Sequence, residues 1–114
     1  MSPITTHVLD TAAGRPAAGV DVTLETSEGG GSFRELARGV TDADGRCRDL
    51  LPDGARLTAG AYRLSFDSGA YFAARGQATF YPQVQVLFAV REPSEHHHVP
   101  LLLSPFGYST YRGS

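Results

Sequence analysis

Three of the four histidines stand side by side at residues 96–98, and the fourth is His7. Imidazole titrates near neutral pH, so each of them can serve as a general base or as a metal ligand. A His-x-His pair on a strand can bind zinc with His7 as third ligand, although no Cys, Asp or Glu stands beside it at ligand spacing. Three uses stay open from these residues alone: a metal site, general base catalysis, or histidines at the exposed end of a strand.

A second group of polar residues ends the sequence. It follows the apolar stretch 99–105, which predicts a core strand. A guanidinium, a phenol, a hydroxyl and an α-carboxylate beside the core are better suited to a site than to a frayed tail. The four residues are Tyr111, Arg112, Gly113 and Ser114.

Arg46 follows the turn residues Asp44 and Gly45, where it is either a solvated charge or a fork of donors for a planar polar ligand. The chain lacks a Gly-x-Ser-x-Gly elbow, a phosphate-binding Gly loop and a His-Glu-x-x-His helix. We therefore expect no covalent nucleophile. Water activated by a histidine, with arginine stabilising the developing negative charge, is the simpler chemistry.

The elements that must position these residues are short strands. Alternation of apolar and polar residues, with turn residues between the runs, predicts an all-β fold of eight strands in a two-sheet β-sandwich, with an open barrel as the alternative. One short helix is expected at 68–76, capped by Asp67 or Ser68 and ended by Gly76. The predicted strands are residues 4–9, 20–25, 36–40, 46–51, 62–67, 84–90, 96–104 and 107–113.

Strand alternation also separates the three adjacent histidines. His96 and His98 share one face of their strand, whereas His97 points to the other face with Val99 and Leu101. Pro105 and Phe106 are expected to form a tight hairpin turn before the last strand.

Composition limits the class of protein. A chain of 114 residues predicts a single domain, 1–114. Its net charge of -2 gives no electrostatic reason to expect nucleic acid or an anionic membrane as a partner. No apolar run is long enough to span a membrane, no secretory signal is visible, and Cys47 is the one cysteine. We therefore expect a cytoplasmic protein.

Four segments carry a resemblance to a known family over essentially the whole chain. They are Thr5-Thr6-His7-Val8-Leu9-Asp10 and Gly14-Arg15-Pro16-Ala17 near the start, Thr41-Asp42-Ala43-Asp44-Gly45-Arg46 in the middle, and the run from His98 to Ser114 at the end. The pattern resembles the 5-hydroxyisourate hydrolases, or transthyretin-related proteins, of the transthyretin family. The closing Tyr-Arg-Gly-Ser separates these hydrolases from transthyretin proper, the hormone carrier of the same fold.

The resemblance implies a transthyretin-like β-sandwich of two four-stranded sheets and one short helix, and a homotetramer, a dimer of dimers with sites in the channel between dimers. It implies hydrolysis of 5-hydroxyisourate to 2-oxo-4-hydroxy-4-carboxy-5-ureidoimidazoline in urate degradation, without a cofactor or a metal. The implied catalytic residues are His7, Arg46, His98 and Ser114. The implied substrate-binding residues are His7, Arg46, Tyr111, Arg112 and Gly113.

One position departs from the family pattern. His97 stands where an aromatic residue, commonly Tyr, is expected, and it points away from His98, so it is not placed in the site. Two other classes of function stay open: a transthyretin-like carrier of a small ligand, and a zinc-binding or purely structural sandwich. A carrier needs neither acid-base groups nor forked donors, so His7, His98 and the terminal tetrapeptide favour the hydrolase.

Overall fold

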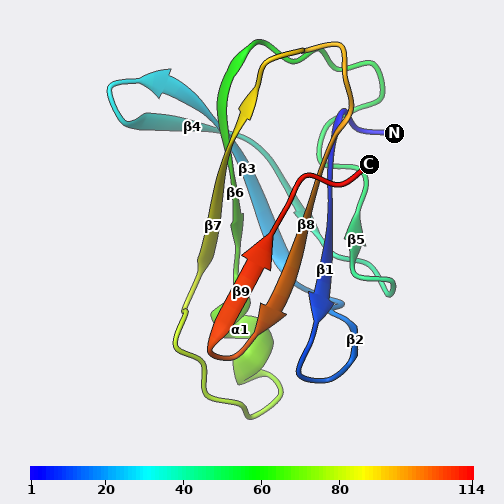
Figure 1. Ribbon diagram of the computed structural model, residues 1–114, viewed down its shortest axis with the longest axis vertical. Helices are drawn as coiled ribbons and strands as arrows, with labels where there is room; N and C mark the ends of the chain where they lie inside the picture. Colours follow the sequence, from blue (N-terminus) through cyan, green and yellow to red (C-terminus); the bar gives the residue numbers. More distant parts are fainter.

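The computed structural model describes residues 1–114 and consists of two β-sheets packed face to face, with a short helix at one end (Figure 1). This confirms the predicted all-β sandwich. The elements are β1 (Ile4–Asp10), β2 (Arg15–Pro16), β3 (Asp21–Gly29), β4 (Ser32–Val40), β5 (Arg46–Cys47), β6 (Gly60–Phe66), α1 (Ser68–Ala73), β7 (Val84–Val90), β8 (His97–Ser104) and β9 (Gly107–Thr110).

The first sheet gathers segments that are far apart in the sequence. Its strand order is β2-β1-β8-β9, and β5 also pairs with β1. Strands β1 and β8 run parallel, whereas the other pairs of this sheet are antiparallel. The second sheet has the order β4-β3-β6-β7 and is antiparallel throughout.

The core lies between the two sheets and follows from the alternation of side chains along each strand. Leu64 and Phe66 of β6 are fully buried, as are Val8 of β1 and Leu101 of β8. Twenty buried hydrophobic residues form one cluster. Burying one such large side chain contributes about 1.5–3 kcal/mol, so this cluster is the main source of stability.

Helix α1 begins and ends as its flanking residues predict. The Asp67 side chain caps the first turn by accepting a hydrogen bond from Ala70 N at 3.1 Å. After the last turn, Gly76 adopts a φ of 66° and Gln77 N donates to Phe72 O at 3.0 Å, which is a Schellman ending. The helical residues stop at Ala73 because the cap takes up the rest of the predicted range. No helix is long and apolar enough to cross a membrane.

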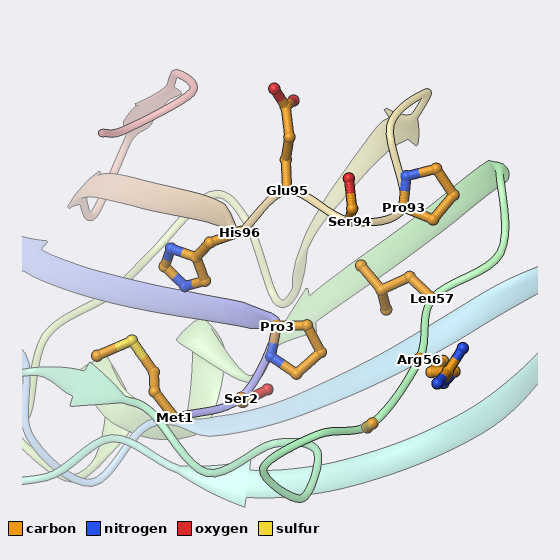
Figure 2. A pocket seen from close by; sticks show the side chains of 10 residues that line it. Met1, Ser2, Pro3, Arg56, Leu57, Pro93, Ser94, Glu95 and His96 are labelled. Carbon is orange, nitrogen blue, oxygen red and sulfur yellow. The ribbon is translucent and has the colours of Figure 1, made fainter.

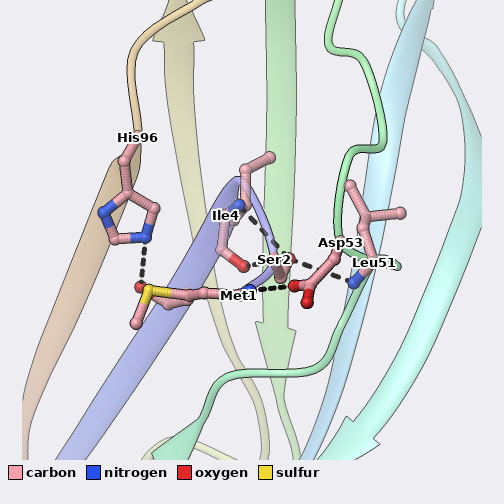
Figure 3. Close-up of polar contacts among 7 residues, drawn as sticks. Met1, Ser2, Ile4, Leu51, Asp53 and His96 are labelled. Carbon is pink, nitrogen blue, oxygen red and sulfur yellow. Dashed lines mark hydrogen bonds and ion pairs between the residues drawn. The ribbon is translucent and has the colours of Figure 1, made fainter.

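The predicted strand 46–51 forms strand pairing only over the two residues of β5. Beyond it, Ser2 N donates to Arg48 O at 3.1 Å. The Ser2 hydroxyl accepts from Leu51 N at 3.1 Å (Figure 3). The same hydroxyl donates to Ile4 O at 2.7 Å, and Ser2 is almost fully buried. A serine side chain therefore replaces the backbone ladder there, and the strand ends early.

Two further segments differ from the predicted elements. The expected loop at 28–32 is a tight turn, because Gly30 and Gly31 adopt φ values of 59° and 84°, so β4 starts at Ser32 rather than at Leu36. The two-residue strand β2 lies in a segment that was expected to be a turn, and it raises the strand count from eight to nine.

Both chain ends lie at the end of the sandwich opposite α1, near β5 and the start of β8 (Figure 1). The beginning of β1, the tail after β9 and strand β5 are therefore neighbours. This arrangement brings the predicted site residues from three parts of the sequence to one end of the first sheet.

Candidate active site

Strands β1 and β5 hold two of the predicted site residues on the face of the first sheet that is turned away from the core. Val8 of β1 and Cys47 of β5 are buried in the core. Because successive side chains alternate between the faces, His7 and Arg46 lie on the opposite face. The strand register pairs His7 directly with Arg46.

The turn before β5 fixes both of these residues. Asp42 Oδ1 accepts hydrogen bonds from Asp44 N and Arg46 N, each at 2.9 Å. These backbone hydrogen bonds hold the pKa of the Asp42 carboxyl below its ordinary value, and the bond from Arg46 N has the largest effect. The Asp44 carbonyl oxygen in turn lies 2.8 Å from His7 Nε2. A carbonyl can only accept, so Nε2 carries a proton and Nδ1 holds the lone pair of neutral His7.

His98 lies on the same outer face, opposite Thr5 in the parallel pairing of β8 with β1. Its Nδ1 lies 2.8 Å from the Thr5 hydroxyl oxygen. Burial lowers the pKa of His98, and Coulomb interactions with the nearby Arg46, His96 and His7 lower it further. His98 is therefore neutral near pH 7, which is the state that a general base requires.

The tail after β9 returns to His98. Strand β9 ends at Thr110, three residues before the predicted end, and Gly113 then pairs with His98 as an isolated bridge. Gly113 N donates to His98 O at 2.8 Å. A Cβ on Gly113 would lie 2.5 Å from His98 Cδ2 and 3.1 Å from Pro100 Cγ, so only glycine fits at this approach.

A hollow of about 150 Å³ lies where these segments meet. It is smaller than the roughly 300–1,000 Å³ of pockets for drug-sized ligands, so it suits a small polar molecule or one part of a larger site. Its lining joins three predicted site residues, Arg46, His98 and Ser114, to Met1, Thr5, Thr6, Arg48 and His96.

Tyr111 and Arg112 line a second depression, of about 220 Å³, beside β7. His98 lines both this depression and the smaller hollow. Arg112 Nη2 lies 3.2 Å from Glu95 Oε1 and donates to His96 O at 3.4 Å. The side chains of both residues are more than half exposed. The fold thus brings His7, Arg46, His98, Gly113 and Ser114 together, whereas Tyr111 and Arg112 point to a neighbouring surface.

A wider hollow of about 570 Å³ opens at the same end of the sandwich (Figure 2). His96 lies at the boundary, since it lines both this hollow and the smaller one. Pro3, Leu57 and Pro93 make much of its wall, and Arg56 stands at its edge (Figure 2). Its acid-base groups are His96 and Glu95, and Glu95 is paired with Arg112, so we place the candidate site in the smaller hollow.

The three adjacent histidines separate as strand alternation predicts. His97 is 4% exposed and packs on the core side of β8, whereas His96 and His98 lie on the other side with their rings stacked at 6.3 Å. No group of three or more His, Cys, Asp or Glu side chains comes together to hold a metal ion.

Five residues that line the hollow were not singled out from the sequence as site residues: Met1, Thr5, Thr6, Arg48 and His96. Alternation contained a signal for Thr5 and Arg48. Thr5 stands two residues before His7, and Arg48 stands two residues after Arg46, so each shares a face with a predicted site residue. His96 was weighed as a metal ligand, as a general base and as a histidine at the end of a strand, but it was not placed in the predicted site.

Comparison with known proteins places this geometry in a family. The model of the HIUase/Transthyretin family matches residues 4–113. A curated relative, the 5-hydroxyisourate hydrolase of Mus musculus, is 47% identical over 114 residues, which cover 99% of this chain and 96% of the relative.

Two solved structures share the fold. The 5-hydroxyisourate hydrolase of Klebsiella pneumoniae has a TM-score of 0.84 at 39% identity and covers 97% of this chain and 98% of its own. Sea bream transthyretin in complex with thyroxine has a TM-score of 0.89 at 33% identity, with 98% and 95% covered. A hydrolase and a hormone-binding protein therefore share this backbone, and the side chains of the site must separate them. The chain belongs to the HIUase/transthyretin family.

Proposed function

We propose that this chain, residues 1–114 acting as one domain, is a 5-hydroxyisourate hydrolase of urate degradation. It opens the six-membered ring of its substrate to give 2-oxo-4-hydroxy-4-carboxy-5-ureidoimidazoline. We call the outer face of the first sheet that carries His7, Arg46 and His98 the acid-base face. The observation that carries the proposal is the contact between the tail, residues 111–114, and this face: Gly113 pairs with His98, and Ser114 and Arg46 line the same hollow. The hydrolase relatives that match the full length of the chain support it.

In the proposed mechanism His98 is the general base. Its Nε2 makes no hydrogen bond within the chain, and its lowered pKa keeps it neutral near pH 7. Nε2 takes a proton from water as the water oxygen attacks the carbonyl carbon of the ring amide. The imidazolium then returns that proton to the departing ring nitrogen as the C–N bond breaks.

Arg46 stabilises the negative charge that develops on the carbonyl oxygen during the attack. A guanidinium offers forked donors to such an oxygen, and one such donor is worth about 10²–10³ in kcat. His7, with Nε2 held by Asp44 O, presents Nδ1 to orient substrate or water. The nucleophile in this proposal is water, and the proposal uses no cofactor.

Ser114, through its hydroxyl or carboxylate, positions the water or a histidine. Tyr111, Arg112 and Gly113 contribute to substrate binding in this proposal. Tyr111 and Arg112 lie at the rim of a neighbouring depression, so their part depends on how copies of the chain assemble.

We propose a homotetramer, a dimer of dimers whose sites face the channel between dimers. Strands β7 and β9 each lie at the edge of a sheet and pair with a neighbour on one side only, and the exposed apolar side chains of Leu87 and Tyr108 lie on these edge strands. Sedimentation that finds only a monomer at micromolar concentration would contradict this assembly. We also propose a cytoplasmic location, which the single free Cys47 supports.

The experiment generates 5-hydroxyisourate with urate oxidase and follows its decay in the ultraviolet. The wild-type chain is expected to accelerate the decay over the spontaneous reaction. A protein that binds thyroxine but leaves the decay unchanged would instead be a carrier. A transthyretin that lacks the closing Tyr-Arg-Gly-Ser is the matched control for the shared fold.

A further inference from the structure

A single hydroxyl group joins two imidazole rings at the edge of the site. The Thr5 oxygen lies 2.8 Å from His98 Nδ1 and 2.9 Å from His96 Nε2. Figure 3 shows the His96 ring turned toward β1. These two ring nitrogens are the only hydrogen-bond partners of the Thr5 hydroxyl. Thr5 is 4% exposed, so little water reaches this oxygen to replace either ring.

One hydroxyl proton cannot serve two lone pairs. Threonine donates one hydrogen bond and accepts others. If Thr5 donates to His96 Nε2, then it must accept from His98, and His98 Nδ1 carries a proton. If Thr5 instead donates to His98 Nδ1, then it must accept from His96, and His96 Nε2 carries a proton. In that case neutral His98 carries its own proton on Nε2. The protonation patterns of the two rings are therefore coupled.

The charges around the hollow favour the first arrangement. Arg46 and Arg48 line the hollow together with His98. Nδ1 is paired with Thr5, whereas Nε2 makes no hydrogen bond within the chain, so a positive charge that acts on Nε2 from the hollow disfavours an N–H there and favours a lone pair. His96 is exposed, and water can satisfy its other nitrogen in either form.

We propose that Thr5 is a positioning residue that, together with His96, keeps the proton of neutral His98 on Nδ1 and so leaves Nε2 free to accept a proton from water. This inference rests on the proposed function. When Nε2 takes the proton, the imidazolium N–H at Nδ1 still donates to Thr5, and Thr5 still donates to His96. No group in the chain has to turn during the step.

The test compares hydroxyl removal with hydroxyl retention at residue 5. Thr5→Val keeps the shape of the side chain and should lower kcat about tenfold or more, as part of the 10²–10⁴ that a general base contributes, while KM changes little. Thr5→Ser should recover most of the rate. Thr11→Val is the matched control, because the Thr11 hydroxyl donates to Leu103 O at 3.1 Å at the other end of the β1–β8 pair.

Variants at residue 96 test the second half of the arrangement. His96→Gln keeps an acceptor for the Thr5 hydroxyl and should retain more activity than His96→Leu, which removes it. Unchanged kcat in both Thr5→Val and His96→Leu, with an active wild type, would overturn the inference.

A spectroscopic measurement separates this inference from the proposed function. Nitrogen-15 NMR of the substrate-free protein at about pH 8, where histidines are neutral, reports which ring nitrogen carries the proton. Wild type should show the His98 proton on Nδ1, and Thr5→Val should shift it toward Nε2. A His98 proton on Nε2 in wild type overturns the inference, whether or not the protein hydrolyses 5-hydroxyisourate. An inactive wild type with the proton on Nδ1 contradicts the proposed function alone.

Discussion

Replacing Gly113 by alanine should damage the site while leaving the fold intact. The added Cβ would lie 2.5 Å from His98 Cδ2, whereas carbon atoms in contact prefer about 3.5 Å or more. The tail and the ring must therefore separate by about 1 Å, and a misplacement of that size can cost about 10²-fold in rate. This loss corresponds to about 2.7 kcal/mol in the activation free energy.

The effect of Gly113→Ala on the free energy of unfolding should be smaller. The substitution weakens one hydrogen bond, from Gly113 N to His98 O, which is worth about 0.5–1.5 kcal/mol. Urea denaturation measures the stability, and 5-hydroxyisourate decay measures kcat. Gly107→Ala is the matched control, because its Cβ would meet only Ser104 Oγ at 3.7 Å. Equal activity in the two alanine variants would refute the contact between tail and His98 as a requirement for catalysis.

Three further predictions concern the frame around the site. Tyr71→Phe removes the hydrogen bond from the Tyr71 hydroxyl to the buried Asp10 carboxylate at 2.8 Å, so urea denaturation should show a loss of about 1.5–3 kcal/mol with kcat unchanged. Because the pKa of His98 is lowered, kcat/KM should persist as the pH falls below 6.5, the ordinary histidine value, and should be lost as the pH falls through the pKa of His98 in the folded protein. Arg46→Gln removes one charge that lowers this pKa, so its pH profile should show the loss at higher pH. Asp42→Ala frees the amide groups that hold the turn before β5, and steady-state kinetics should show kcat about tenfold lower; an unchanged kcat would mean that the turn holds its shape without the carboxylate.

The two-sheet sandwich could be predicted from the sequence because a strand buried on one face alternates apolar and polar residues. That signal is strong in β6 and β7, where the predicted and observed strands nearly coincide. The signal is weak where a side chain, rather than a neighbouring strand, makes the hydrogen bond to a backbone group. Strand 46–51 looked continuous, but the Ser2 hydroxyl occupies Leu51 N, and no local pattern reveals a bond across 49 residues.

The site was predictable to a similar degree. His7, Arg46 and His98 were expected from their residue types and from the family resemblance, and alternation placed His97 correctly on the core side of β8. Thr5 was missed because a threonine on a strand is ordinary. Its proposed role could be inferred only once the structure showed that the parallel register of β1 and β8 sets it opposite His98.

The central claim is that the acid-base face of the first sheet hydrolyses 5-hydroxyisourate. Its most direct test is the initial rate of 5-hydroxyisourate decay with His98→Gln, compared with wild type at equal concentration of folded protein. We expect the variant to retain the fold and to lose about 10²-fold or more of the rate, as the removal of a general base requires. Decay as fast as with wild type would contradict the assignment of catalysis to this face.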